Sequence, residues 1–364
     1  MKWTTIAFCF IPWTYAITQT TFSSGNHVLE MTGIINTYLS YFDRNAEEDQ
    51  FGFELRDVRF LLSGEHYPAF KYQIMVDFAD LGSSDSLENF LQDAYVNIDL
   101  PSKFDLFVGF QRMPFGRNSN VSTFSSVFHE RPFISGGSLY YRRNLGLVVR
   151  KKFMDDLINL HVGLFNGGNS LRLRDSKSNT MSFVFRTDLS FPTKILYEEV
   201  DVRLTPVPLF SIGLNTMFTQ HEREVEQNFF PIEIDGQKWI SAIDLAFFFQ
   251  GFSFQLEATQ SWANRNNSAT QDLADAFESY GLHFSTNYFF KNINSLLSFR
   301  YEIFNPDNSR YDHDFQSISV GFNFLVNQSH DQVFRAEYRH FFEDNNDTTF
   351  SNSREVHLGF QFRF

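Results

Sequence analysis

The sequence predicts an all-β fold, a transmembrane antiparallel up-and-down β-barrel of about sixteen strands. Apolar and polar residues alternate in segment after segment, these segments are long, and short turns alternate with long polar loops. A strand that crosses a bilayer at a tilt needs about 9–11 residues, whereas strands of soluble proteins have about five or six. Short turns on one side and long loops on the other are typical of outer-membrane barrels.

The composition supports this prediction. The chain has 364 residues, of which 47 are Phe, 14 Tyr and 4 Trp, yet its mean hydropathy is −0.27. Aromatic residues favour strands, so many strands with one apolar face are expected. No segment after the N-terminus reaches the run of about 18 apolar residues that a transmembrane helix needs. The net charge of −13 argues against nucleic acid as a partner.

The N-terminal residues are predicted to be a secretory signal peptide. Lys2 precedes an apolar stretch, and Thr14 and Ala16 place small residues at positions −3 and −1 of a cut. We therefore expect residues 1–16 to be removed and 17–364 to form a single barrel domain. The cut would also remove Cys9, the only cysteine, which excludes disulfides, thiolate metal ligands and cysteine nucleophiles.

Alternation with a period of two defines the strands in order. The expected spans are 28–42, 51–64, 68–80, 89–100, 103–112, 138–151, 156–166, 195–205, 208–220, 238–250, 252–263, 277–290, 293–304, 313–326, 331–342 and 353–364. Met181, Phe183 and Phe185 also alternate, but another full strand would break the up-and-down parity. We assign 167–194 to an external excursion or to an extension of the eighth strand, and an eighteen-strand count stays open.

The connections follow the expected asymmetry. Short ones lie at 101–103, 205–208, 250–251 and 291–293, and long polar ones at 43–50, 113–137, 221–237, 264–276, 305–312 and 343–352. Because the strand count is even, both termini fall on the periplasmic side, below an outer membrane of lipid. A barrel of this width cannot be filled by its own inward side chains, so an aqueous lumen is expected.

The last strand ends on Phe364, after the apolar face formed by Val356, Leu358, Phe360 and Phe362. A terminal aromatic residue resembles the signal that the barrel-assembly machinery of Gram-negative bacteria reads. We therefore expect that machinery to be a partner during insertion.

Several motifs resemble the phosphate-selective porin O and P family. The stretches 55–64, 70–72 and 77–80 resemble its beginning, and 93–96, 108–117 and 130–132 resemble the segment that leads into its third loop. The match is clearest over 51–151 and continues weakly through 202–206 to the terminal Phe. The resemblance implies a sixteen-strand homotrimeric porin whose loop after strand five, here 113–137, folds inward and constricts the pore.

As an outer-membrane porin, the protein would let small hydrophilic solutes or inorganic ions diffuse through a water-filled channel. Strand phase places bases and acids in similar numbers on the lumen side, so the wide lumen has no anion-favouring field. The inward bases expected are Arg59, Arg150, Arg203, Arg300, Arg335, Arg339 and Arg363. The inward acids expected are Asp77, Asp93, Asp105, Asp201, Asp244, Glu257, Glu302, Glu337 and Glu355.

The third loop differs from the rest of the chain in charge. From residue 112 to 143 there are five arginines and one acid: Arg112, Arg117, Glu130, Arg131, Arg142 and Arg143. In one interpretation these guanidiniums line the constriction and favour anions there. In the other, Arg131 pairs with Glu130 or with a wall acid to hold the loop, while Arg142 and Arg143 are solvated rim charges.

No motif for catalysis, a phosphate loop or zinc is present, so we expect no enzyme activity, no catalytic residue, no cofactor and no metal site. His129 lacks a second ligand at helical spacing, and His161, His283 and His357 fall on separate strands. Three alternatives stay open: a hydrolase whose Ser–His pair no motif reveals, an adhesin with acidic loops, and a saccharide-specific channel. In the last, the inward rings of Phe107, Phe165 and Phe248 would either form a sugar slide or pack against the third loop.

Overall fold

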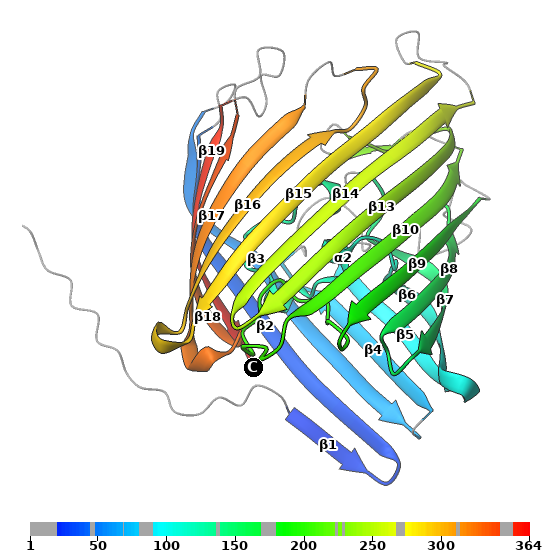
Figure 1. Ribbon diagram of the computed structural model, residues 1–364, viewed down its shortest axis with the longest axis vertical. Coiled ribbons are helices and arrows are strands. Elements are labelled where there is room, and N and C mark those ends of the chain that lie inside the picture. Colours follow the sequence, from blue (N-terminus) through cyan, green and yellow to red (C-terminus); the bar gives the residue numbers. More distant parts are fainter. Residues whose placement is uncertain are drawn as a thin grey trace, which may run out of the picture.

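The computed structural model describes residues 20–43, 48–67, 69–79, 90–135, 139–168, 180–222, 225–227, 230–266, 274–310, 314–342 and 352–364. Sixteen of its strands form one closed antiparallel barrel, which confirms the predicted fold class (Figure 1). The ring closes because β9 pairs with β10 and β19 pairs with β2. Closure leaves no open sheet edge in the ring, as a sheet in lipid requires.

The barrel strands are β2 (His27–Asp43), β3 (Gln50–His66), β4 (Phe70–Asp77), β5 (Leu91–Leu100), β6 (Phe104–Arg112), β7 (Arg143–Phe153), β8 (Ile158–Asn166), β9 (Met181–Phe191), β10 (Leu209–His221), β13 (Gly236–Phe249), β14 (Phe252–Arg265), β15 (Ala276–Phe290), β16 (Ser295–Asn305), β17 (Phe315–Leu325), β18 (Gln332–Phe341) and β19 (Arg354–Arg363). Between β10 and β13, β11 (Val225–Gln227) and β12 (Phe230–Glu233) form a small separate hairpin.

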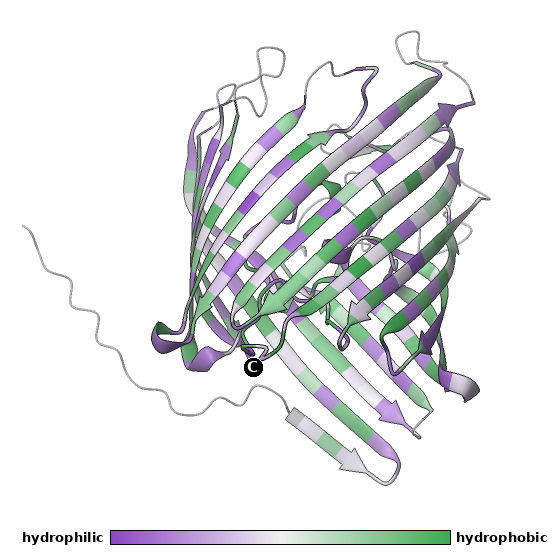
Figure 2. Ribbon diagram, viewed as in Figure 1, coloured by the Kyte–Doolittle hydropathy of each residue, from purple (hydrophilic) through white to green (hydrophobic). Residues whose placement is uncertain are grey.

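The period of two is visible along the wall. Apolar and polar residues alternate along most of the strands in Figure 2. On β19, Leu358 and Phe360 are exposed on the outer face, whereas Glu355 and His357 are buried inside. The outer face therefore offers apolar side chains to lipid, and the polar residues are left for the lumen.

The eighth barrel strand was placed wrongly by the sequence prediction. It is β9, which pairs with β8 and β10, and residues 195–205 form no strand. Residues 192–208 are instead a long connection on the periplasmic side, the side of the C-terminus. Pro192, Pro206 and Pro208 flank this connection and lack the backbone N–H that a central strand must donate. Because β9 takes the place of the predicted strand 195–205, the barrel has sixteen strands, and the alternative count of eighteen is wrong.

The two ends of the barrel chain meet beside an additional strand. β1 (Thr20–Ser24) lies outside the ring and pairs with β2 from His27 to Met31, below the part of β2 that pairs with β19. The backbone N–H of Gly33 donates to the Phe364 carbonyl at 2.7 Å, and the Phe364 N–H donates to the Gly33 carbonyl at 2.9 Å. Phe364 thus completes the ring at its periplasmic end. The expected signal peptide lies outside the described residues.

The connection between β6 and β7, residues 113–142 and here called loop 3, folds into the barrel. It carries α2 (Arg117–Asn120) and the short 3-10 turns η2 (Thr123–Ser125) and η3 (Phe133–Ser135). Its apolar side chains pack on the wall in two clusters, one around Phe115 and Phe165 and one around Phe128 and Phe289. No helix among the described residues is long and apolar enough to cross a membrane.

Candidate functional site

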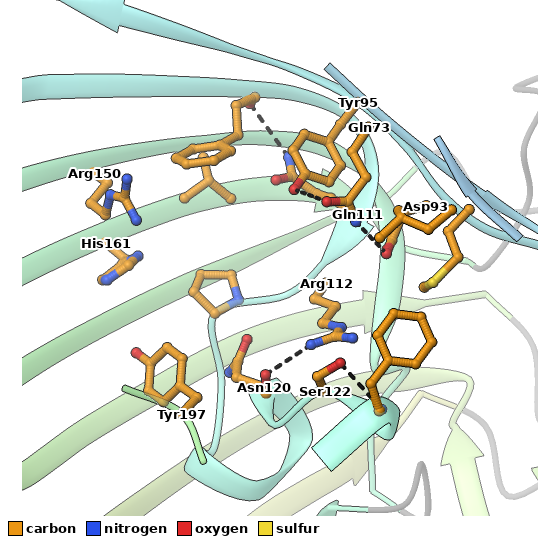
Figure 3. Close-up of a pocket in the computed structure, with 16 residues that line it drawn as sticks. Gln73, Asp93, Tyr95, Gln111, Arg112, Asn120, Ser122, Arg150, His161 and Tyr197 are labelled. Carbon is orange, nitrogen blue, oxygen red and sulfur yellow. Dashed lines mark hydrogen bonds between the residues drawn. The ribbon is translucent and has the colours of Figure 1, made fainter. Parts of the chain in front are cut away.

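A cavity of about 350 Å³ lies between loop 3 and the wall formed by β3 to β8 (Figure 3). Loop 3 contributes Pro114, Asn120, Ser122 and Phe124 to its lining. The wall contributes polar, charged and aromatic side chains, among them Gln73, Asp93, Tyr95, Phe107, Gln111, Arg112, Arg150 and His161. The cavity is therefore a water-accessible space at the level where loop 3 narrows the barrel.

Two further cavities continue this space along the same side of the lumen. One of about 300 Å³ shares Gln73, Tyr95 and Phe107 with the central cavity and continues toward the start of β2. Another of about 230 Å³ shares Arg150, His161 and Tyr197 with it and continues toward β9. The three cavities are therefore neighbours along the wall from β2 to β9.

The other half of the lumen is occupied by loop 3, which wall carboxylates hold by its backbone. Glu257 on β14 accepts hydrogen bonds from the N–H groups of Arg117 and Asn118, both at 3.0 Å. Glu302 on β16 accepts the Phe133 N–H at 2.8 Å, and Glu337 on β18 accepts the His129 N–H. These inward acids therefore bind the loop and do not line the open cavities.

Wall arginines on the same side donate hydrogen bonds to carbonyl groups of loop 3 or to the carboxylates that hold it. Arg300 donates to the Glu130 carbonyl at 2.8 Å, and Arg335 donates to the Ser126 carbonyl at 2.8 Å. Arg339 donates to Glu302 at 2.6 Å. All three lie on the lumen side of their strands, but they anchor the loop and its carboxylate partners and do not line the open cavity.

Three arginines of the cavity region donate mainly to backbone carbonyl groups of loop 3, and Arg131 also donates to the Thr123 hydroxyl. Arg112 donates to the Asn120 carbonyl at 2.8 Å, Arg131 to the Asn118 carbonyl at 2.7 Å, and Arg142 to the Ser119 carbonyl at 2.6 Å. All three also reach the Val121 carbonyl. Among the described residues, no carboxylate lies within 4.0 Å of these guanidiniums. This arginine cluster (Arg112, Arg131 and Arg142) therefore carries positive charge with no direct ion pair to a described carboxylate, and the nearest acids, Asp93 and Glu199, act on it only from beyond 4.0 Å.

The surroundings of the cluster destabilise its positive charges. Burial, and then the neighbouring Arg112, lower the pKa of Arg131 to about 9. Burial, and then Arg131, lower the pKa of Arg142 well below its ordinary value. An anion in the adjacent cavity would offset this cost, because it would supply the missing opposite charge.

The other charged residues of the loop region have different surroundings. Arg117 is 1% exposed, lies away from the cavity, and donates to the Leu196 carbonyl at 2.7 Å. Arg143 pairs with Asp93 at 3.0 Å. The side chain of Glu130 is half exposed and lies 3.7 Å from Arg56, so it does not pair with Arg131. Among the expected constriction residues, only Arg112 lines the central cavity.

The remaining predicted lumen charges mostly pair along the wall. Arg59 binds Asp77 at 2.6 Å, and Arg150 binds Asp105 at 2.6 Å. Arg203 differs from the prediction, because it lies in the 192–208 connection rather than on a strand. Its exposed side chain binds Glu198 at 2.7 Å.

The 192–208 connection adds a second inward segment that the sequence prediction missed. The Glu199 carboxylate accepts the Val127 N–H of loop 3 at 2.7 Å, and the Glu199 carbonyl accepts Asn287 Nδ2 at 3.0 Å. Tyr197 reaches the cavity from this connection (Figure 3). The signal available in the sequence was the set of three prolines, which marks 192–208 as a connection and leaves 181–191 as the strand.

The three inward phenylalanines have three different surroundings. Phe165 packs in the cluster that contains Met113, Phe115 and Leu139 of loop 3, and Phe248 packs with Ile195 of the connection. Of the three, only Phe107 lines the cavity, with the Arg150 guanidinium 5.0 Å from its ring centroid, and it also packs against the cluster that contains Phe115 of loop 3.

The model of the family described as phosphate-selective porin O and P matches residues 36–187, which confirms the predicted resemblance over that segment. The matched segment includes β3 to β8, loop 3 and the wall of the central cavity. No curated protein matches the sequence.

Solved outer-membrane barrels share the fold at low identity. An anion-selective porin from Comamonas acidovorans has a TM-score of 0.62 and 10% identity, over 93% of this chain and 100% of its own. Salmonella typhi OmpF in complex with daunomycin has a TM-score of 0.62 and 11% identity, over 95% and 100%. The outer-membrane channel DcaP of Acinetobacter baumannii has a TM-score of 0.59 and 13% identity, over 94% and 99%.

Proposed function

Because residues 36–187 match the phosphate-selective porin O and P family and the barrel has the porin fold, we propose that the protein is an outer-membrane diffusion channel for small hydrophilic solutes and ions. The apolar outer face and the closed ring are those of a protein of the Gram-negative outer membrane. The contiguous cavities along β3 to β9 supply the water path.

The channel prefers anions at its constriction. The observation that carries this proposal is the arginine cluster, whose three guanidiniums bind carbonyls and no carboxylate. The cavity acid Asp93 is compensated by Arg143 at 3.0 Å, and Asp188, beside the neighbouring cavity, by Arg186 at 2.6 Å. The walls are protein rather than water, so an uncompensated charge acts more strongly on a passing ion.

Arg112 is the residue to test, because it both belongs to the cluster and lines the cavity. We expect Arg112→Gln to shift the reversal potential toward cation preference in planar bilayers under a potassium chloride gradient. Arg112→Lys retains the charge and should keep most of the anion preference. An unchanged reversal potential in Arg112→Gln would contradict the proposal, and channels without defined conductance steps would contradict the porin function itself.

A saccharide-specific channel is the second candidate. Tyr95, Phe107 and Phe124 all line the central cavity, and aromatic rings stack on the apolar faces of sugars. Concentration-dependent block of the ion current by neutral oligosaccharides, lost in Phe107→Ala, would favour this function. If neutral sugars do not block the current, the saccharide-specific function is contradicted and the anion-preferring channel is the function that stands.

The channel is further proposed to act as a homotrimer without enzyme activity, exported by a signal peptide over 1–16. A solved relative of the fold, OmpT of Vibrio cholerae, is described in a trimer form. Phe364, which closes the ring on Gly33, is proposed to be read by the barrel-assembly machinery. Native gel migration of the folded protein tests the trimer, and N-terminal sequencing of the outer-membrane form tests the cut.

A further inference from the structure

Three metal-ligand side chains from three separate elements meet where loop 3 contacts the wall. His129 Nε2 of loop 3 lies 2.6 Å from Glu54 Oε1 on β3, and His357 Nδ1 on β19 lies 3.9 Å from the same oxygen. The three ligand atoms all lie within 4.8 Å of one another. In the sequence these residues are far apart, so only the folded barrel reveals the group.

The second ring nitrogen of each histidine faces a carboxylate. His129 Nδ1 lies 3.4 Å from Glu130 Oε1, and His357 Nε2 lies 3.7 Å from Glu355 Oε2. Metal-ligating histidines almost always present their other nitrogen to a carboxylate, a carbonyl or a water, which fixes the ring and raises its basicity. Each histidine therefore has a carboxylate within 4.0 Å of its second ring nitrogen. Ser40 Oγ lies 2.8 Å from His357 Nδ1 and donates to Glu54 Oε1 at 2.6 Å, so a hydroxyl also links two of the three side chains.

The charge balance around the group also favours a cation. Glu54, Glu130 and Glu355 surround the two rings, and the arginines near them are Arg56, 3.7 Å from Glu130, and Arg339, 4.0 Å from Glu355. His129 and His357 are buried, whereas the side chain of Glu54 is 34% exposed. A cation from water can therefore reach the group through the Glu54 side.

We propose that Glu54, His129 and His357 bind one divalent transition-metal ion of the Zn²⁺ class, which ties loop 3 to β3 and β19. Two imidazoles and one carboxylate suit Zn²⁺, Ni²⁺ or Cu²⁺, whereas Ca²⁺ and Mg²⁺ prefer oxygen ligands only. The rings are stacked, with centroids 4.0 Å apart and planes at 2°, so binding requires them to splay. His129 lies outside any helix or strand, which permits this movement. The site is independent of which solute the channel passes.

The test is a calorimetric titration: zinc chloride is added to the folded protein in detergent, and the heat of binding is measured. All samples carry His66→Gln, because His27 and His66 form a second histidine pair with ring nitrogens 3.1 Å apart. We expect one Zn²⁺ per chain, and loss of that binding in His129→Gln and in His357→Gln. Glu130→Gln and Glu355→Gln should retain binding with an affinity lowered by about 10–100-fold, as for other residues that orient a ligand.

The matched control is His283→Gln, which removes another buried lumen histidine from outside the group. It should bind Zn²⁺ as the parent does, and the heat-dependent gel shift of barrel proteins verifies the fold of every variant. Absence of saturable Zn²⁺ binding by the folded parent would overturn the proposal. So would equal binding by the parent and both histidine variants.

Discussion

A glycine on the last strand makes room for the ring that braces loop 3. Gly359 on β19 is paired with Tyr38 on β2, and a Cβ atom at position 359 would lie 2.2 Å from Tyr38 Cε1. The Tyr38 hydroxyl accepts a hydrogen bond from Arg335 at 2.9 Å, and its ring meets His129 edge-on. The side chain absent at 359 thus allows a contact that reaches from the wall to loop 3.

We expect Gly359→Ala to lower the free energy of unfolding by about 1–3 kcal/mol, because the added methyl group must displace a buried ring. Urea unfolding of the barrel in lipid vesicles measures this change. Gly52→Ala is the control, since a Cβ atom there meets nothing within 4 Å. Its effect should stay within about 0.5 kcal/mol, and equal effects of the two substitutions would contradict the argument.

Loop 3 and the 192–208 connection stabilise each other inside the lumen. Glu199 of the connection is 4% exposed and accepts hydrogen bonds from Val127 N at 2.7 Å and Asn118 Nδ2 at 3.0 Å. Val200 packs in the same apolar cluster as Val127 and Phe128. The constriction is therefore built by two segments, one entering from the external end of the barrel and one from the periplasmic end.

Glu199→Ala should loosen loop 3, because two buried donors of the loop lose their acceptor. We expect noisier open-channel current and a larger mean conductance in single-channel recordings. Glu198→Ala is the matched control, since that side chain is partly exposed and its one ion pair among the described residues is with the exposed Arg203. Indistinguishable recordings from the two variants would show that the connection does not hold the loop.

Across the whole molecule, the lumen is divided into an open half and a filled half. The connected cavities follow β3 to β9. Loop 3 packs mainly against β10 and β13 to β19, although Phe165 on β8 and Val184 on β9 also belong to its apolar cluster. Wall carboxylates and arginines on the filled side bind the loop backbone. An inward position on a strand therefore does not by itself expose a side chain to passing solute.

This division predicts which lumen positions react with a water-soluble thiol reagent. Gln73 lines the open path, whereas Ser298 on β16 is 1% exposed in the filled half. The expected mature chain has no cysteine, so Gln73→Cys and Ser298→Cys each introduce a unique thiol. Gln73→Cys should react quickly and lose conductance, and Ser298→Cys should react slowly with little change. The reverse order would place the water path on the other side of the barrel.

Sequence reasoning located fifteen of the sixteen barrel strands, because lipid on one face and water on the other impose a period of two on every strand. The eighth strand was missed, although Met181, Phe183 and Phe185 alternate with polar residues. A strand at 195–205 satisfied the even strand count equally well. The prolines around 192–208 were the stronger signal, because a residue without an N–H cannot complete a central ladder. The requirement for an even number of strands limits how many strands there are, but it does not tell which of two neighbouring segments is the strand.

The candidate site was predicted less completely than the barrel. The sequence by itself determined the barrel and the local excess of arginines, because periodicity and composition are properties of neighbouring residues. The inward loop was implied by the resemblance to the porin O and P family. Only the tertiary structure decided that Arg117 is buried against Leu196, that Arg112 faces the cavity, and that His129 meets His357. These outcomes depend on contacts between residues far apart in the chain, and local periodicity carries no information about which distant backbone group a side chain will reach.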